Sequence, residues 1–315
     1  MRIGTAGQNE ALVTQMLRKQ AELFETQRQV QTGKKYDDVE GFGAGTASLV
    51  SSKSLMSRLN GFYDTNKLVS GRLEAFDTAL GELDNIGARL RDAMQNARAI
   101  GDGTGFIPEV RSLFEQTVSV LNTRFEGRFL FGGTNSDQPP MAVETADQLI
   151  ATAEPPVGDY FNGDPAALTA RLDERTSVAL GTTATVGQDL INAMQRLLQF
   201  DDGTVPNGVT IAAGSLDGKL SDEQRDFVGQ EVDRVLAALD GIRTAAAENG
   251  LNIRVVGDVQ ARLEDQKITL TELIASREDA DLAETATKLN QQQVALEASM
   301  RVIGKLKELS LVNLI

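Results

Sequence analysis

The sequence contains no histidine, no cysteine and no tryptophan in its 315 residues. A chain without histidine or cysteine cannot form a Ser-His-Asp or Cys-His nucleophile, a histidine general base, or a thiolate or imidazole metal site. The lack of cysteine also excludes disulfide bonds. These absences remove most enzyme chemistry and leave only what carboxylate, lysine and arginine side chains can do.

Basic charge and long apolar runs are also scarce. There are 31 basic residues against 45 acidic ones, a net charge of −14, so the phosphate backbone of a nucleic acid is repelled on average. No apolar run approaches the roughly 20 residues of a membrane span. Polar residues also interrupt the first 20 residues, where a signal peptide needs an apolar stretch. We therefore expect no nucleic-acid partner, no membrane span and no cleaved signal peptide.

Aromatic residues make up only 5% of the chain, although 41% of its residues are hydrophobic. This composition favours thin helical packing over one large globular core. The length is sufficient for two or three domains.

Both ends of the chain show the pattern of a coiled-coil seam. Apolar residues recur at seven-residue spacing over 282–309, with Ala286, Gln293 and Met300 at the intervening positions, and a similar stripe runs through residues 9–30. Because the flanking residues are polar, each helix has one narrow apolar stripe, which must be buried against the other end or against other molecules. The predicted seam residues are Leu12, Met16, Leu23, Val30, Leu282, Leu289, Leu296, Met300, Ile303, Leu306, Leu309, Leu311 and Leu314.

Two alternatives remain open for this seam. A heptad stripe is often an ordinary intramolecular coiled coil instead of a self-assembly surface. Gln293 either sets the register of the seam, as single polar core positions can, or faces solvent.

The segment after the N-terminal seam predicts a helical hairpin. Residues 46–100 have helical periodicity that Gly87 interrupts, residues 101–105 form a glycine-rich turn, and residues 108–128 form a second helix.

The composition changes over residues 132–218, which hold six of the seven prolines. Short β-like runs at 168–172 and 176–185 and an amphipathic helix at 188–199 predict a small inserted domain.

Helical periodicity returns after this insertion. Ser221 and Gln224 form a capping box that begins a helix, Asn249 and Gly250 end it, and a further helix leads to the C-terminal seam. Asp279 and Asp281 are predicted to cap that last helix.

These patterns predict three parts. The terminal coiled-coil pair comprises residues 1–34 and 277–315, the helical rod comprises residues 35–134 and 219–276, and the small β-containing outer domain comprises residues 135–218. The predicted fold class is mainly α, an elongated rod of long antiparallel helices.

Acidic and glycine clusters give weak indications of chemistry. The glycines at 41–45 and the Gly33-Lys34-Lys35 segment do not match a dinucleotide or P-loop motif. Asp37-Asp38 and Asp201-Asp202 are adjacent pairs, which we interpret as solvated loops. A carboxylate glycan hydrolase in the insertion remains a remote alternative, and it rests only on Asp159, Asp164, Asp173 and Glu174 near Tyr160 and Phe161.

Several segments resemble the flagellins and flagellar hook-associated proteins. Residues 281–315, with DLAETATKLNQQQVALEASMRVI and the ending LSLVNLI, are similar to the terminal signature of this family. The opening Met1-Arg2-Ile3-Gly4-Thr5 and the segment from Gln29 to Lys35 look like the start of the hook-associated branch. Residues 127–134, GRFLFGGT, followed by Pro139-Pro140-Met141, are similar to the segment that leaves the rod for the outer domain at the hook–filament junction.

The resemblance implies a structural subunit of the bacterial flagellum, with no enzymatic activity and no cofactor. It implies export through the flagellar type III apparatus without signal cleavage and an extracellular location. The implied partners are further copies in a helical or ring assembly, a neighbouring hook-associated protein, flagellin, and an export chaperone on the C-terminal helix. A hook–filament junction adaptor is the favoured function, and a filament-forming flagellin is the alternative.

Overall fold

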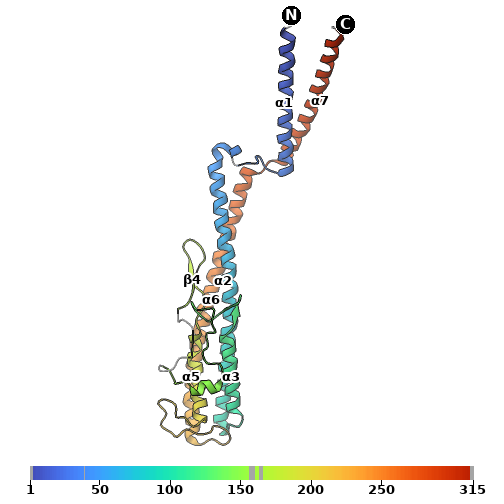
Figure 1. Cartoon of the computed structure of the whole chain (residues 1–315). Coiled ribbons are helices and arrows are strands. Elements are labelled where there is room, and N and C mark those ends of the chain that lie inside the picture. The colour runs from blue at the N-terminus through green and yellow to red at the C-terminus, as the bar shows by residue number, and fades with distance from the viewer. Residues whose placement is uncertain (1–2, 39, 156–159, 163–165, 313–315) are drawn as a thin grey trace. The chain divides into compact units, whose positions relative to one another are not determined.

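Two long antiparallel helices organise the computed structural model, which describes residues 3–38, 40–155, 160–162 and 166–312 (Figure 1). Helix α2 (Thr46–Ile100) has 55 residues and helix α6 (Asp222–Glu278) has 57 residues. The chain divides into two compact units, one of residues 1–60 and 265–315 and the other of residues 61–264, and both long helices contribute to each unit. The mainly α fold class is confirmed.

The first unit pairs the two ends of the chain. Helices α1 (Ile3–Thr32) and α7 (Leu282–Val312) lie side by side, with the start of α1 and the end of α7 at the same end of the pair (Figure 1). An antiparallel bridge between Lys34 and Asp279 joins the opposite end. The predicted pairing of the N- and C-terminal helices is confirmed.

Local signals set the ends of these helices. Helix α1 stops at Thr32 because Gly33 takes a φ of 70°, a left-handed conformation that closes helices at low cost. Asp281 caps α7, since its Oδ1 accepts hydrogen bonds from the backbone nitrogens of Ala283 at 2.9 Å and Glu284 at 3.1 Å. The Asp281 cap was predicted from the sequence, and it is confirmed.

The second unit is built around one core. Helices α3 (Phe106–Leu121) and α5 (Gln188–Asp201) pack with the adjacent parts of α2 and α6, and the six-residue helix α4 (Ala146–Ala151) packs against α5. Aromatic residues pack closely inside, where the rings of Phe200 and Phe227 stack with centroids 4.2 Å apart. The predicted helix at 188–199 is confirmed and extends to Asp201.

Two predicted helix breaks are absent. Helix α2 continues through Gly87 because the missing side chain there makes room for α6, where a Cβ would lie 2.7 Å from Cδ2 of Leu239. Helix α6 likewise continues through Asn249 and Gly250, because Asn249 is buried and its Nδ2 donates to the backbone oxygen of Leu73 at 2.8 Å. In both helices, tertiary contacts thus outweigh the tendency of these residues to end a helix.

The helix predicted over 108–128 is also too long. It ends at Leu121 and is followed by a hairpin of β1 (Arg124–Phe125) and β2 (Arg128–Phe129). Glu126 and Gly127, with φ of 50° and 81°, form the two-residue turn of type I′ that suits the twist of a hairpin. The glycine turn before α3, in contrast, is where the sequence predicts it, between Ile100 and Phe106.

The inserted segment differs from a separate domain. It contains a second antiparallel hairpin, of β3 (Thr169–Arg171) and β4 (Ser177–Ala179), and the short helix η2 (Ala184–Gly187). Its elements are too short to bury much apolar surface against one another. Its large apolar side chains, Met141, Leu149, Tyr160 and Leu190 among them, therefore join the same core as α2, α3 and α6.

Candidate functional site

The paired helices α1 and α7 place most of the described seam residues at their contact. Seven of the predicted side chains are half-buried, whereas Leu282 is 54% exposed and Met300 is 46% exposed. The side chains of Leu306, Leu309 and Leu311, and the whole of Leu314, lie outside the described residues. The half-buried seven are Leu12, Met16, Leu23, Val30, Leu289, Leu296 and Ile303.

The inner face of α7 has another register than the sequence suggests. Three residues alternate with the half-buried Leu289, Leu296 and Ile303 at spacings of four and three, namely Thr285, Gln292 and Ser299. Gln293 is exposed. Leucines at seven-residue spacing can share a helix face with the residues three positions later or with those four positions later. The sequence permits both faces, and contact with α1 selects one of them. Of the two alternatives for Gln293, the structure shows the solvent-facing one.

Polar residues weaken this inner face. Thr26 and Thr285 are 2% and 7% exposed, and each hydroxyl donates to the backbone oxygen four residues earlier, at 2.9 and 2.6 Å. Within the described residues, Oε1 of Gln292 is buried without a hydrogen-bond partner. An inner face with this many polar groups gives the isolated pair little hydrophobic stabilisation.

The outer faces of the pair expose large apolar side chains. On α1, Val13, Leu17 and Phe24 are 45%, 56% and 67% exposed, and on α7 Val294 and Val302 are 68% and 53% exposed. Large apolar side chains that are exposed on one face of a helix are typical of sites of protein association. The seam analysis missed these residues because it followed one stripe per helix, although the spacing of Val13, Leu17 and Phe24 was readable as a second stripe.

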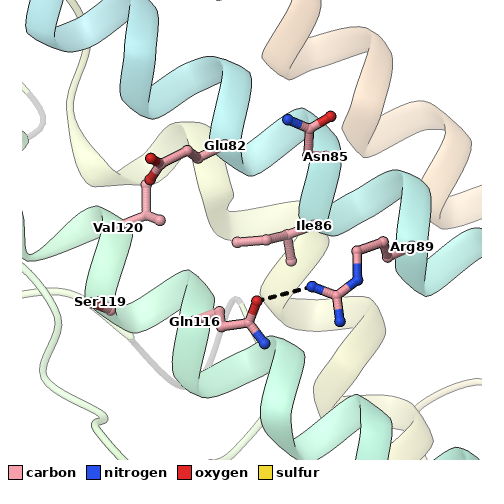
Figure 2. Close-up of a pocket in the computed structure, with 7 residues that line it drawn as sticks. All are labelled: Glu82, Asn85, Ile86, Arg89, Gln116, Ser119 and Val120. Atoms are coloured by element: carbon pink, nitrogen blue, oxygen red, sulfur yellow. Dashed lines mark hydrogen bonds between the residues drawn. The ribbon is translucent and has the colours of Figure 1, made fainter.

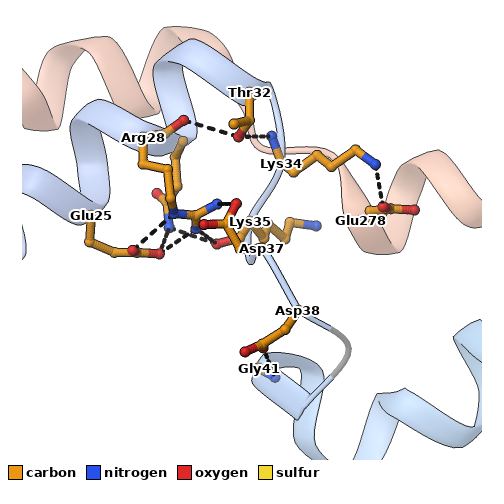
Figure 3. A network of polar contacts seen from close by, with 10 residues as sticks. Glu25, Arg28, Thr32, Lys34, Lys35, Asp37, Asp38, Gly41 and Glu278 are labelled. Atoms are coloured by element: carbon orange, nitrogen blue, oxygen red, sulfur yellow. Dashed lines mark hydrogen bonds and ion pairs between the residues drawn. The ribbon is translucent and has the colours of Figure 1, made fainter.

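A polar network joins the end of α6 to the segment after α1 (Figure 3). Glu278, which is 7% exposed, accepts Nζ of Lys34 at 2.6 Å and Nζ of Lys53 at 2.8 Å. The hydrogen bond from Lys34, followed by that from Lys53, holds the pKa of this carboxyl below its ordinary value of 4.5. Nζ of Lys35 donates to the backbone oxygen of Ser276 at 2.9 Å, so a cation covers the negative end of α6.

Arg28 closes the other side of this network (Figure 3). Its Nε donates to Glu25 at 3.0 Å, its Nη1 to Asp37 at 2.6 Å and its Nη2 to the backbone oxygen of Lys35 at 3.1 Å. Oδ1 of Asp38 accepts the backbone nitrogen of Gly41 at 3.1 Å. Asp37 and Asp38 are both exposed in the loop after α1, as the solvated-loop interpretation expects, and their carboxylates also bond within this connection.

The second unit carries an open groove between α2 and α3 (Figure 2). It has a volume of about 330 Å³ and a floor made by Ile86 and Val120. Nη1 of Arg89 donates to Oε1 of Gln116 across it at 3.0 Å. The remaining lining residues are Glu82, Asn85 and Ser119. Nothing in this groove pairs a nucleophile with a base.

Asp173, one of the carboxylates behind the glycan hydrolase alternative, has a structural role. Oδ1 of Asp173 accepts the backbone nitrogens of Arg175 and Thr176 at 2.7 and 2.6 Å, and its Oδ2 accepts Arg262 at 2.9 Å. Tyr160 is 1% exposed. Asp159 and Asp164 lie outside the described residues.

Sequence patterns gave no sign of a buried ion-pair cluster in the second unit. Arg196 contacts Glu154 and Glu231, each at 2.9 Å, and all three side chains are at most 7% exposed. Burial raises the pKa of the Glu231 carboxyl, and the charge of Arg196 opposes that rise. Breaking such a buried cluster leaves an uncompensated charge, so these residues fix the loop at Glu154 onto α5 and α6.

Comparison with known proteins gives one family match and several structural neighbours. The family described as the bacterial flagellin N-terminal helical region matches residues 3–136. Comparison with curated proteins gives no match. Among the described residues, no helix has the length and apolar character to cross a membrane.

Two solved structures share the fold at low sequence identity. A putative flagellar hook-associated protein from Vibrio parahaemolyticus is 14% identical with a TM-score of 0.58, and the match covers 76% of this chain and 98% of that one. FlgL from Xanthomonas campestris is 11% identical with a TM-score of 0.55, covering 72% of this chain and 99% of that one. Residues 3–136 thus match the bacterial flagellin N-terminal helical region, and the chain shares its fold with the solved structures of a putative flagellar hook-associated protein and of FlgL.

Proposed function

We propose that this chain is a structural subunit of the bacterial flagellum, an adaptor that assembles at the junction of hook and filament. In this role the terminal helices α1 and α7 bind neighbouring subunits. The protein needs no catalytic group or cofactor for such a function.

The observation that carries the proposal is the apolar outer surface of the α1–α7 pair. Leu17, Phe24 and Val294 are each more than half exposed. The inner contact between the helices is partly polar, with Thr26 and Thr285 buried in it. A pair with a weak inner contact and an apolar outside gains most when other subunits cover that outside.

The polar network at Glu278 supports this role. It ties the connection after α1 to the end of α6 through contacts separated by more than 200 residues in sequence, such as that between Lys34 and Glu278. Both terminal helices therefore start from a common anchored base. Assembly of this anchored pair therefore loses less conformational entropy than assembly of two free helices would lose.

The proposal extends to export and partners. We propose an extracellular location in the flagellum, reached through the flagellar type III apparatus without signal cleavage, which the lack of cysteine suits. The proposed partners are further copies in a ring or helix, a neighbouring hook-associated protein and flagellin. An export chaperone that covers the C-terminal helix would shield its apolar residues before export.

A filament-forming flagellin is the second candidate, favoured by the family match over residues 3–136. The two candidates differ in self-polymerisation. Purified protein would be added to short sheared filament seeds and to hook ends, at increasing concentration, and observed by electron microscopy. An adaptor caps hook ends and stops, whereas long growth with a regular lattice would establish a flagellin and overturn the adaptor proposal.

A further inference from the structure

Two arginines of the second unit, Arg72 and Arg128, act on each other electrostatically, and neither forms an ion pair with a carboxylate of the described residues. Arg72, on α2, is half-buried, and its Nη2 donates to the backbone oxygen of Leu130 at 3.2 Å. Its Nε is buried and has no hydrogen-bond partner within the described residues. Burial and then the charge of Arg128, on β2, lower the pKa of Arg72. The pair therefore holds two like charges near each other.

The β1–β2 hairpin places Arg128 on the side that faces α2. Phe125 and Arg128 are cross-strand partners, and the ring of Phe125 lies against α2, where a Cβ on Gly71 would come within 3.3 Å of it. Arg124 belongs to the other cross-strand pair and stacks on Phe129, with its guanidinium carbon 4.2 Å from the ring centroid. The hairpin thus separates Arg124 from the pair formed by Arg72 and Arg128.

This arginine pair is unusual in a chain of net charge −14. Neither Arg72 nor Arg128 forms an ion pair with any part of the chain that the structure describes. Two guanidinium groups without a counter-charge repel each other, and a carboxylate placed between them relieves that repulsion with charge-assisted hydrogen bonds. The arginine pair is therefore suited to an acidic side chain from another molecule.

A matching acidic surface lies on α6 of the same unit. Asp226, Asp233 and Asp240 are exposed at seven-residue spacing, which places them on one face of the helix, about 10 Å apart along its axis. The neighbouring arginines of α6 contact other acids, Arg225 with Asp222, Arg234 with Glu231 and Arg243 with Asp84. Among the described residues, the three aspartates form no ion pair, and we call them the aspartate stripe.

The arginine pair and the aspartate stripe are not partners within one copy. Asn249 of α6 bonds to the backbone of Leu73, next to Arg72, and Asp240 precedes Asn249 by nine residues. That separation is about 13 Å along the helix. Each copy carries both surfaces, and within the described residues neither surface has a counter-charge.

We propose that the arginine pair Arg72–Arg128 of one copy binds the aspartate stripe of the next copy. The inference rests on the proposed function, because it names a contact that joins subunits in the assembly. The two surfaces are different, so the contact is head-to-tail and generates a ring or a helix instead of a closed two-fold dimer. Opposite charges also orient the copies during encounter.

Charge-reversal variants test the contact in solution by sedimentation velocity at low salt. Arg128→Glu and Asp233→Arg are each expected to weaken self-association about tenfold or more, since like charges then face each other. An equimolar mixture of the two variants is expected to restore it, because each reversed surface meets its complement on the other variant. Arg124→Glu, which changes the same charge on the opposite face of the hairpin, is the matched control and is expected to associate as the wild type does.

A cross-link tests the contact in flagella, and the cysteine-free chain gives it an unambiguous readout. Copies carrying Arg128→Cys and copies carrying Asp233→Cys are expressed together, and isolated flagella are treated with a short bismaleimide. A covalent dimer is expected, and none with Arg124→Cys in place of Arg128→Cys. Thermal melting of every variant at the wild-type temperature shows that the fold is intact.

The outcomes separate the two proposals. Normal presence in flagella without the cross-link overturns the arginine contact and leaves the junction function standing. Absence of the wild-type chain from flagella overturns the proposed function. The contact is then tested only by whether mixing Arg128→Glu with Asp233→Arg restores self-association in solution. Equal association of Arg128→Glu and Arg124→Glu, or no recovery on mixing, also overturns the contact, and the partner of the arginine pair is then not a second copy.

Discussion

Removing the exposed apolar side chains of α1 should abolish assembly without affecting the fold. The perturbation is the double substitution Leu17→Ala and Phe24→Ala. These side chains are 56% and 67% exposed, so the isolated chain loses little when they are truncated. Fully burying one such side chain contributes about 1.5–3 kcal/mol. In an assembly that covers these side chains, each truncation loses that free energy multiplied by the exposed fraction of the side chain. The sum is about 2–4 kcal/mol, or roughly 30- to 700-fold in affinity.

The assay compares stability and incorporation of the same protein. Thermal melting by circular dichroism should match the wild type, while the amount of the variant recovered in isolated flagella should fall at least tenfold. Leu251→Ala is the matched control, since Leu251 is 57% exposed on α6 and lies outside the terminal pair. Normal incorporation of the double variant would refute the argument that the outer face of α1 is covered by other subunits. An equal loss for the control would show that any exposed apolar residue has the same effect.

Three further predictions follow from the described contacts. Leu296→Asp should prevent assembly but leave the second unit folded, as judged by circular dichroism and limited proteolysis; normal incorporation would contradict this. Glu278→Gln should lower the stability of the first unit by about 1 kcal/mol in urea unfolding, because two half-exposed lysine contacts are lost. Because Lys34 lowers the pKa of Glu278, this stabilisation is complete above pH 4.5 and disappears as the pH falls through the folded value, so the variant and the wild type should converge in acid. Gly87→Leu should destabilise the second unit by about 1–3 kcal/mol, since the new side chain overlaps Leu239; an unchanged melting temperature would show that the two helices separate easily there.

Local sequence signals predicted the secondary structure well where residues that are close in sequence decide it. The glycine turn before α3, the Ser221–Gln224 capping box and the Asp281 cap all act over three or four residues, and each is present. The interaction partners in these motifs are close in sequence, so no other part of the chain can displace them.

Sequence signals that compete with tertiary contacts gave wrong predictions. Gly87 and the Asn249-Gly250 pair weaken a helix in isolation, but contacts between α2 and α6 outweigh that cost. At Glu126-Gly127 the error has the opposite direction, because a local turn was missed there. Both residues adopt a positive φ and form the hairpin turn, whereas the apolar spacing alone predicts that the helix continues.

The sequence by itself determined that the chain is mainly helical, that each end carries an apolar helical stripe that needs a partner, and that histidine and cysteine chemistry is excluded. These follow from residue types and from periodicity, which are local properties. Only the tertiary structure decided the register of the α1–α7 contact, the burial of Arg196 between Glu154 and Glu231, and the meeting of Lys34 with Glu278. Each depends on residues that are about 35 or more positions apart in the sequence. A periodic pattern fixes the face of a helix, whereas the partner of that face depends on the free energy of the whole packed chain.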